Sequence, residues 1–306
     1  MDRLQILCFA GTYGLALAAE LARLVVRSPI RWHLTVILTA LGWLVQTLYL
    51  ANLAVKEGVP LPVTTSFESM MVLSWIVGLI GLYLMLHWPR NVAVGVFVLP
   101  LVLGLIAAAG RFAPRGPEWV ESGMFAFWGT VHGIFLLAGA VCTCLAFAAG
   151  LMYLAQMRRL KAKRPAPSGF SLPSLEQSER VNRAAITVAF PLLTFGLLIG
   201  MVLSVKARAE AVAAAAGEVA GAGAAAAVYG GVPVIRWSDP KVVSALGMWA
   251  VFAALLHARF RPAMRGRSVM LLTIVAFAFL VFTWVGVEAL RLPTAHGAAR
   301  VAGGSS

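Results

Sequence analysis

Long apolar runs alternate with short polar segments along the whole chain. Each run has about the 20 residues that an α-helix needs to cross a hydrocarbon core about 30 Å thick. The runs cover residues 4–26, 33–55, 67–87, 92–110, 131–156, 184–205, 242–258 and 268–290. The pattern predicts an all-α fold: a polytopic membrane helical bundle of about eight transmembrane helices, forming one domain over residues 1–306.

Two of the connections are longer than the others. The loop 157–183 contains Ser174, with Gln177 three residues later, which is typical of a helix start and predicts that the sixth helix begins before the membrane. The loop 206–241 contains a low-complexity stretch of Ala and Gly at 209–231, which indicates either a flexible linker or a weak helix. We do not expect this stretch to be a ninth span.

The composition agrees with a chain embedded in the lipid bilayer. Hydrophobic residues make up 60% of the sequence and charged residues 12%, and the mean hydropathy is +0.87. A water-soluble domain of this size needs more charge on its surface. The formal net charge of +13 does not indicate nucleic-acid binding, because the basic residues lie at the ends of the predicted helices.

The basic residues predict how the chain is oriented. One face of the bundle receives 15 of the 25 Lys and Arg residues, including the dense runs at 157–164 and 259–267. The positive-inside rule makes this face cytoplasmic. Both termini are then outside, together with the loops 56–66, 111–130 and 206–241. Residues 4–26 are too long and too apolar for a cleavable signal, so they are expected to be the first span.

The five histidines fall on two sides of the membrane under this topology. His132 and His296 lie outside, whereas His33, His87 and His257 lie on the cytoplasmic side. About 25 Å separates Pro240 from His257 along the seventh helix.

The outer side also gathers aromatic and cationic residues, namely Trp119, Trp128, Arg236, Trp237 and Lys241. Haem would suit this set, since its iron takes imidazole ligands, its plane stacks on aromatic rings and its carboxylates pair with cations. These residue types are also common at membrane interfaces without any ligand, and that alternative stays open.

Three acids invite simpler interpretations. Asp239 either orients Lys241 or caps the seventh helix. Glu20 lies within the first span, where an acid is a functional candidate, but a pair with Arg23 is the simpler expectation. Glu288 is expected to pair with Arg291 in the same way.

Four stretches of the chain resemble the haem-handling cytochrome c assembly family, specifically its CcsA and HemX-like branch. They are PLPVTTSFESMMVLSW at 60–75, VHGIFLLAGAVCTCLAFAAGLMYLAQMRRLK at 131–161, LPSLEQSERVNRAAITVAFPLLTFGLLIG at 172–200 and WSDPKVVSALGMWAVFAALLHAR at 237–259. They occur in the family's order, and Glu68 matches an acid characteristic of the family. The last stretch resembles the family's Trp-rich signature, and His296 follows it at 39 residues from His257.

The resemblance implies roles for individual residues. His132 and His296 would be the two outer axial ligands of haem iron, and His257 a membrane-embedded haem ligand. Trp237, Asp239 and Lys241 would form the cofactor-binding remainder of the Trp-rich motif. The family's function implies a multi-pass protein of a bacterial-type inner membrane that presents haem outside for attachment to apocytochrome c, with the help of a ResB-type assembly partner.

The chain also departs from the family pattern. The segment GGVPVIRWSDPKVV has a single Trp, and Val242 stands where an acid is usual. Such degeneration is typical of HemX-like members, so the alternative function is a membrane regulator or scaffold of haem-synthesis or assembly enzymes without haem transfer. A small-molecule transporter is a third hypothesis, although no inverted repeat is visible. No nucleophile with a base is recognisable, so we expect at most a subunit of a haem-attachment complex.

Overall fold

The computed structural model describes residues 2–25, 29–59, 61–63, 65–88, 92–113, 124–163, 171–219, 238–258, 266–290 and 292. These residues are almost entirely helical. The helices are α1 (Asp2–Val25), α2 (Pro29–Glu57), α3 (Ser66–His87), α4 (Gly95–Phe112), α5 (Met124–Lys161), α6 (Leu175–Val219), α8 (Pro240–Ala258), α9 (Arg267–Val281), a π-helical turn η1 (Phe282–Gly286) and α10 (Val287–Ala289).

The predicted membrane spans are confirmed. Within the described residues, eight helices are long and apolar enough to cross a bilayer, and η1 and α10 continue the last of them. The helices alternate in direction, so the starts of α1, α3, α5 and α8 lie at one end of the bundle. We refer to this end as the outer end, after the orientation that the charge pattern predicts, and to the opposite end as the inner end.

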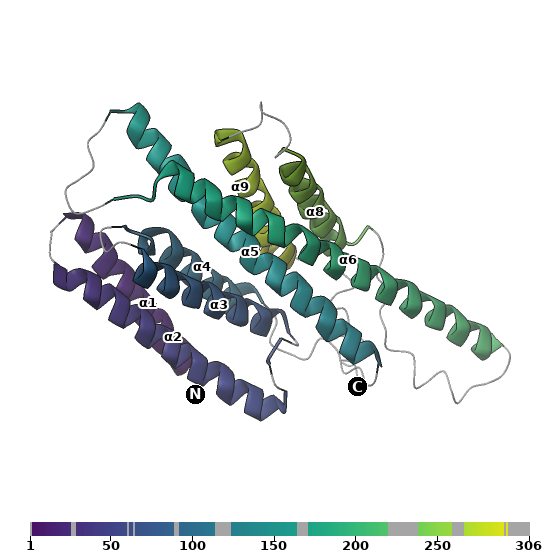
Figure 1. Cartoon of the computed structure of the whole chain (residues 1–306). Coiled ribbons are helices and arrows are strands. Elements are labelled where there is room, and N and C mark those ends of the chain that lie inside the picture. Colours follow the sequence, from purple (N-terminus) through teal and green to yellow (C-terminus); the bar gives the residue numbers. More distant parts are fainter. Residues whose placement is uncertain are drawn as a thin grey trace.

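The bundle has three parts (Figure 1). Helices α1–α4 pack together on one side, α8 and α9 lie on the other, and the long antiparallel pair α5 and α6 runs between them. Helix α5 is central, since it contacts α3, α4, α6 and α9. At the inner end the backbone N–H of Ala93 donates to the carbonyl of Ser171 at 3.1 Å, which ties the start of α4 to the segment before α6.

A buried polar network joins the first three helices. The Tyr13 hydroxyl donates to Oε1 of Gln46 at 3.1 Å, and Nε2 of Gln46 donates to Oγ of Ser74 at 2.8 Å and to the Met71 carbonyl at 3.1 Å. All three polar side chains are fully buried. Hydrogen bonds of this kind hold membrane helices together where lipid offers polar groups no partner.

Helical structure extends into both of the long connections. Helix α5 continues to Lys161 and α6 begins at Leu175, well inside the predicted loop 157–183. The predicted N-cap is confirmed, because Oγ of Ser174 accepts from the Gln177 N–H at 3.1 Å. Helix α6 also continues to Val219, so residues 206–219 of the predicted loop 206–241 are helical. Its alanines have the highest helix propensity of any residue, and residues 220–237 lie outside the described part of the chain.

Candidate functional site

His132 lies near the outer end of α5, against a pair of glycines on α6. A Cβ at Gly200 would come within 2.6 Å of the His132 ring, and a Cβ at Gly196 would come within 2.7 Å of Leu136. Any larger residue would therefore collide with α5. Gly196 and Gly200 form a GxxxG pair, which lets two membrane helices approach closely. The two glycines four residues apart in FGLLIG, which are visible in the sequence, leave the space that the histidine ring occupies.

The hydrogen bond of His132 selects one tautomer of its ring. Nδ1 lies 2.7 Å from the carbonyl oxygen of Gly196. A carbonyl oxygen only accepts, so Nδ1 must be the donor. The neutral ring then carries its lone pair on Nε2, and a ring N–H donated to a backbone carbonyl is the usual arrangement of a metal-ligating histidine. The ring is half-buried.

Asp239 caps α8 at the same end of the bundle. Its Oδ1 accepts from the backbone N–H of Lys241 at 2.9 Å, and its carbonyl accepts from the Val243 N–H. Pro240 occupies the first helical position, where its missing N–H costs nothing. Of the two roles predicted for Asp239, the cap is confirmed.

The Lys241 side chain forms an ion pair with Glu288. The ammonium and the carboxylate are 3.0 Å apart, with only 13% and 25% of the two side chains exposed. The sequence predicted Arg291 as the partner of Glu288. Arg291 lies outside the described residues, and the Glu288 carboxylate reaches across to Lys241 on α8. Recognising this pair required the three-dimensional arrangement of α8 and α10.

A second contact joins α8 to the π-helical turn. Oγ of Ser244 and Oγ1 of Thr283 are 2.8 Å apart, and Thr283 belongs to η1. π-Helical turns in α-helices occur frequently at functional sites. Further along α8, Nε1 of Trp249 donates to Oγ1 of Thr194 at 2.9 Å, which fixes α8 to α6. No sequence pattern had indicated any of these four residues.

The other predicted outer residues divide into two groups. Trp128 is on α5, with 41% of its surface exposed and its ring edge-on to Phe127. Trp119, Arg236, Trp237 and His296 lie outside the described residues. The structure therefore brings Asp239, Lys241 and Glu288 together, and it places His132 against α6 at the same end.

His257 lies at the inner end, on the last turn of α8, where its side chain is exposed. The neighbouring residues Leu255, Leu256 and Ala258 line a cavity of about 570 Å³ between α8, α5, α6 and α9, but His257 is not among its described lining residues. The polar part of the lining includes Tyr153 and the buried Asn182, whose amide donates to the Ala146 carbonyl at 2.8 Å. This volume is typical of small-molecule pockets.

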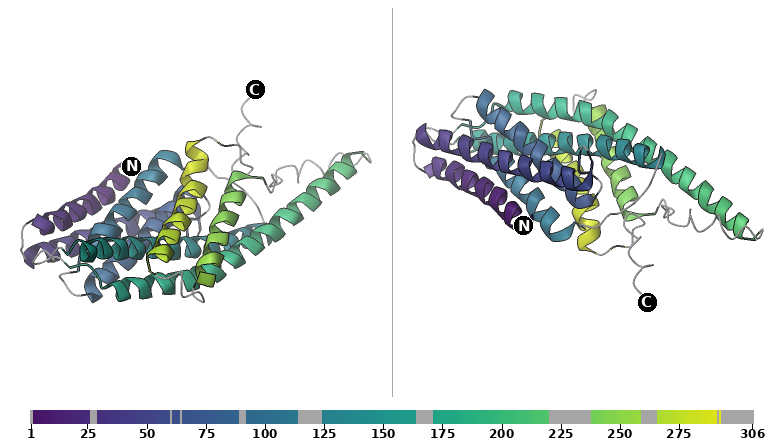
Figure 2. Two further views of the ribbon diagram at one scale, coloured as in Figure 1. Left: turned by 90° about the horizontal axis from the view of Figure 1, so that it is seen from above. Right: turned by 90° about the horizontal axis from the view of Figure 1, so that it is seen from below.

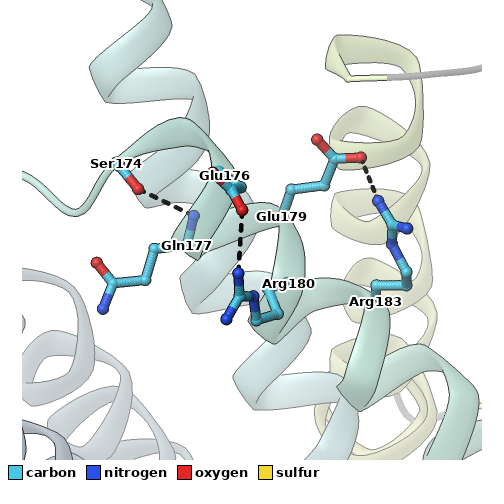
Figure 3. Close-up of polar contacts among 6 residues, drawn as sticks. All are labelled: Ser174, Glu176, Gln177, Glu179, Arg180 and Arg183. Atoms are coloured by element: carbon cyan, nitrogen blue, oxygen red, sulfur yellow. Dashed lines mark hydrogen bonds and ion pairs between the residues drawn. The ribbon is translucent and has the colours of Figure 1, made fainter.

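Two ion pairs lie along the start of α6 (Figure 3). Glu176 pairs with Arg180 at 3.0 Å and Glu179 pairs with Arg183 at 2.8 Å, each four residues apart on the helix. Such exposed pairs contribute little to stability but suit a helix that leaves the membrane. Glu179 and Arg183 also line the cavity.

The remaining polar candidates have local structural contacts. His33 and His87 are both exposed, and Nδ1 of His87 lies 3.0 Å from the carbonyl of Tyr83 on its own helix. Glu68 forms a capping box with Thr65 at the start of α3, at 3.2 Å and 3.3 Å. The Thr-Ser-Phe-Glu spacing was the sequence signal for that box. Glu20 is buried and packs against Gly95 of α4; the side chain of Arg23, its predicted partner, lies outside the description.

Comparisons with known proteins agree with this architecture. A family model described as "Cytochrome C assembly protein" matches residues 219–292, which contain α8 to α10. The chain is 25% identical to a "Cytochrome c biogenesis protein CcsA" of Synechococcus sp. (strain JA-2-3B'a(2-13)) over 75% of each chain, and 26% identical to that of Synechococcus sp. (strain CC9605) over 93% of each. It is 30% identical to "Protein HemX" of Brevibacillus brevis, over 52% of this chain and 58% of that protein. No solved structure matches.

The fold defines the chain as a multi-pass α-helical membrane protein. By these matches, the chain is similar to proteins of cytochrome c biogenesis.

Proposed function

We propose that this protein binds haem at its outer end during cytochrome c assembly and presents it for attachment to apocytochrome c. His132 supplies one axial ligand through Nε2, and His296 supplies the second, as the family resemblance implies. Trp237 contributes an aromatic surface. Haem when bound supplies the iron and the vinyl groups that become attached; this chain contributes ligation, orientation and placement.

The hydrogen bond from His132 to the Gly196 carbonyl carries this proposal. It fixes the tautomer that a metal needs, and Gly200 fixes the position of the ring. Among the described residues, no group of three or more His, Cys, Asp or Glu side chains is arranged to hold a metal ion. A bare cation would require such a group, whereas haem iron already has four ring nitrogens and needs only axial ligands.

The start of α8 is the second part of the proposed site. Asp239 keeps the helix start in place, and Lys241 is the cation nearest to it in the sequence. Because Lys241 already pairs with Glu288, binding a haem carboxylate requires the ammonium to exchange or share that partner. The strength of this ion pair would then affect the affinity for haem at the outer end.

The location and the partners belong to the same proposal. We infer a bacterial inner membrane with both termini outside, since the basic runs at 157–164 and 259–267 follow the positive-inside rule. A ResB-type partner completes the assembly complex. His257, exposed at the inner end of α8, is the candidate ligand of a second haem within the membrane.

A HemX-like regulator without haem transfer is the alternative. It is favoured by the similarity to the HemX protein and by the ion pair that occupies Lys241. In that case the outer end stabilises the fold, and the protein controls the abundance of haem-synthesis or assembly enzymes.

Absorption spectra separate the two functions. The purified protein from haem-sufficient cells should show a Soret band, and the His132→Ala, His296→Ala double variant should lose most of it. His87→Ala is the matched control, because that exposed histidine is held by its own helix. A wild-type protein without haem, combined with altered levels of haem-synthesis enzymes in a deletion strain, would contradict haem presentation and favour the regulator.

A further inference from the structure

Helix α6 is far longer than a membrane requires. Its 45 residues extend about 67 Å at 1.5 Å per residue, whereas the hydrocarbon core is about 30 Å thick. The α5–α6 register pairs Leu136 with Gly196 and His132 with Gly200. Continued outward, this register places Met124, the first residue of α5, opposite Arg208. Beyond that point α6 extends past the other helices, as Figures 1 and 2 show.

One side of α6 carries exposed apolar residues at alternating spacings of three and four. We call this row the α6 seam; its described members are Leu198, Val202, Val205, Ala209 and Val212. Their valines and leucine are 48–65% exposed. The sequence continues the register with Ala216 and Val219. This is the a/d pattern of a helix that packs against another helix.

The position of the seam matters more than its apolarity. Lipid accounts for exposed residues in the membrane-spanning part of α6, including Leu198 and Val202. It does not account for Val212, which lies about 10 Å further along the helix than Val205. Helical segments as short as the part of α6 beyond Arg208, residues 209–219, are marginal when isolated in water, because helix stability normally comes from packing of an apolar face. The seam therefore continues without interruption from lipid into the aqueous region.

Two cations flank the outer part of the seam. Lys206 and Arg208 are exposed and occupy the two positions beside Val205 and Ala209 that correspond to e and g of a coiled coil. A second copy packed in parallel would bring the same cations to the same level, with like charges close together. Acidic residues on the facing helix would instead form attractive pairs at these positions.

We propose that the α6 seam binds a helix of a partner protein that crosses the same membrane beside α6, continues outside it, and carries acidic residues opposite Lys206 and Arg208. The partner is defined by this chemistry: an apolar row at the same three-four spacing with carboxylates on its flanks. The inference does not depend on haem ligation, because no residue of the seam belongs to the proposed haem site.

Site-specific photo-crosslinking in native membranes tests this inference. A benzophenone amino acid replaces Val212 in the full chain, and a matched control replaces Ala214, which the helical register puts on a different side of α6. The Val212 position should yield one adduct to a second protein. The cross-linked peptide, sequenced by mass spectrometry, should contain a membrane-spanning apolar row followed by Asp or Glu at its flanks. The control should yield little of this adduct.

Charge reversal provides the second arm. The K206E/R208E variant should lower the adduct yield by about fivefold, and Lys substitutions at the partner's acidic residues should restore it. An adduct to a second copy of this chain, equal adducts at both positions, no adduct, or a yield unaffected by charge reversal would each overturn the proposal. The Soret band of the same preparations reports independently on the proposed function.

Discussion

Two polar side chains in this bundle, one buried and one half-buried, lie against glycines, but they use their polar atoms differently. Tyr13 on α1 lies against Gly78 of α3, and His132 on α5 lies against Gly200 of α6. Tyr13 belongs to a network in which its hydroxyl donates to Gln46, and the Gln46 amide donates to Ser74. His132 donates one nitrogen to a backbone carbonyl, and its tautomer makes the other nitrogen an acceptor.

The comparison distinguishes a polar side chain that only holds helices together from one that can also bind a ligand. A close glycine contact and a hydrogen bond to another helix are present in both places, so neither feature identifies a site. The distinguishing feature is an oriented lone pair on a nitrogen that metals bind.

The Gly200→Ala variant should have the largest effect on haem. Its Cβ would come within 2.6 Å of Cε1 and 2.9 Å of Nδ1 of His132, so the ring must move and its bond to Gly196 must break. We expect haem per folded protein to fall more than about tenfold, as supporting contacts of metal ligands typically control affinity by 10–100-fold.

Gly78→Ala is the paired control, because its Cβ would come within 2.9 Å of the Tyr13 hydroxyl. It should destabilise the fold by about 1–3 kcal/mol through overpacking, with haem per folded protein unchanged. Soret absorbance normalised to the monodisperse fraction distinguishes the two variants. Equal haem loss in both variants would contradict a specific role of the Gly200 contact with His132 in haem binding.

Replacing Gln46 with Leu should destabilise the first three helices. The Tyr13 hydroxyl loses its acceptor and the Met71 carbonyl loses one donor, which costs about 1–2 kcal/mol in a membrane protein. Thermal denaturation in detergent should shift to lower temperature, while the haem spectrum stays unchanged. A changed spectrum would show that the network reaches the outer end.

A double-mutant cycle on Lys241 and Glu288 should give a coupling energy of about 1 kcal/mol. Lys241→Met and Glu288→Gln each remove one partner of the ion pair. The stability losses of the two single variants should therefore sum to more than the loss of the double variant. If Lys241 also binds a haem carboxylate, Glu288→Gln should strengthen haem retention during dilution. Unchanged retention would exclude Lys241 from the haem site.

The smallest expected effect comes from Ser174→Ala at the inner end. It removes the bond from the Gln177 N–H, for a cost of about 0.5–1 kcal/mol to the start of α6. Neither Tyr13 nor His132 should respond. Stability measured by denaturation sets the scale for the larger effects, and a haem loss here would mean that the first turn of α6 controls its outer end.

Much of the fold could be predicted from local sequence patterns. Spans are set by apolar length, and the caps at Ser174 and Asp239 follow from residue type at a helix start. The capping box of Glu68 was equally visible but was not recognised. The extension of α6 to Val219 was harder to predict, because alanine favours a helix while the neighbouring glycines favour a linker.

The candidate site depends more on contacts between distant segments. His132 could be chosen as a candidate from its place in the sequence, but its tautomer depends on a carbonyl 64 residues away. The sequence suggests a pair between Glu288 and Arg291, which lies outside the described residues, whereas the antiparallel return of the last helix brings Lys241 within reach of Glu288. The predicted roles of Trp237 and His296 stay predictions.

Imidazole rescue tests the central claim most directly. The claim is that Nε2 of His132 is an axial ligand of haem iron at the outer end. If His132 is an axial ligand, the oxidised and reduced spectra of the purified His132→Gly variant should lose their six-coordinate bands. Added imidazole should restore these bands in a saturable way. Spectra that are the same as those of the wild type, with no response to imidazole, would contradict it.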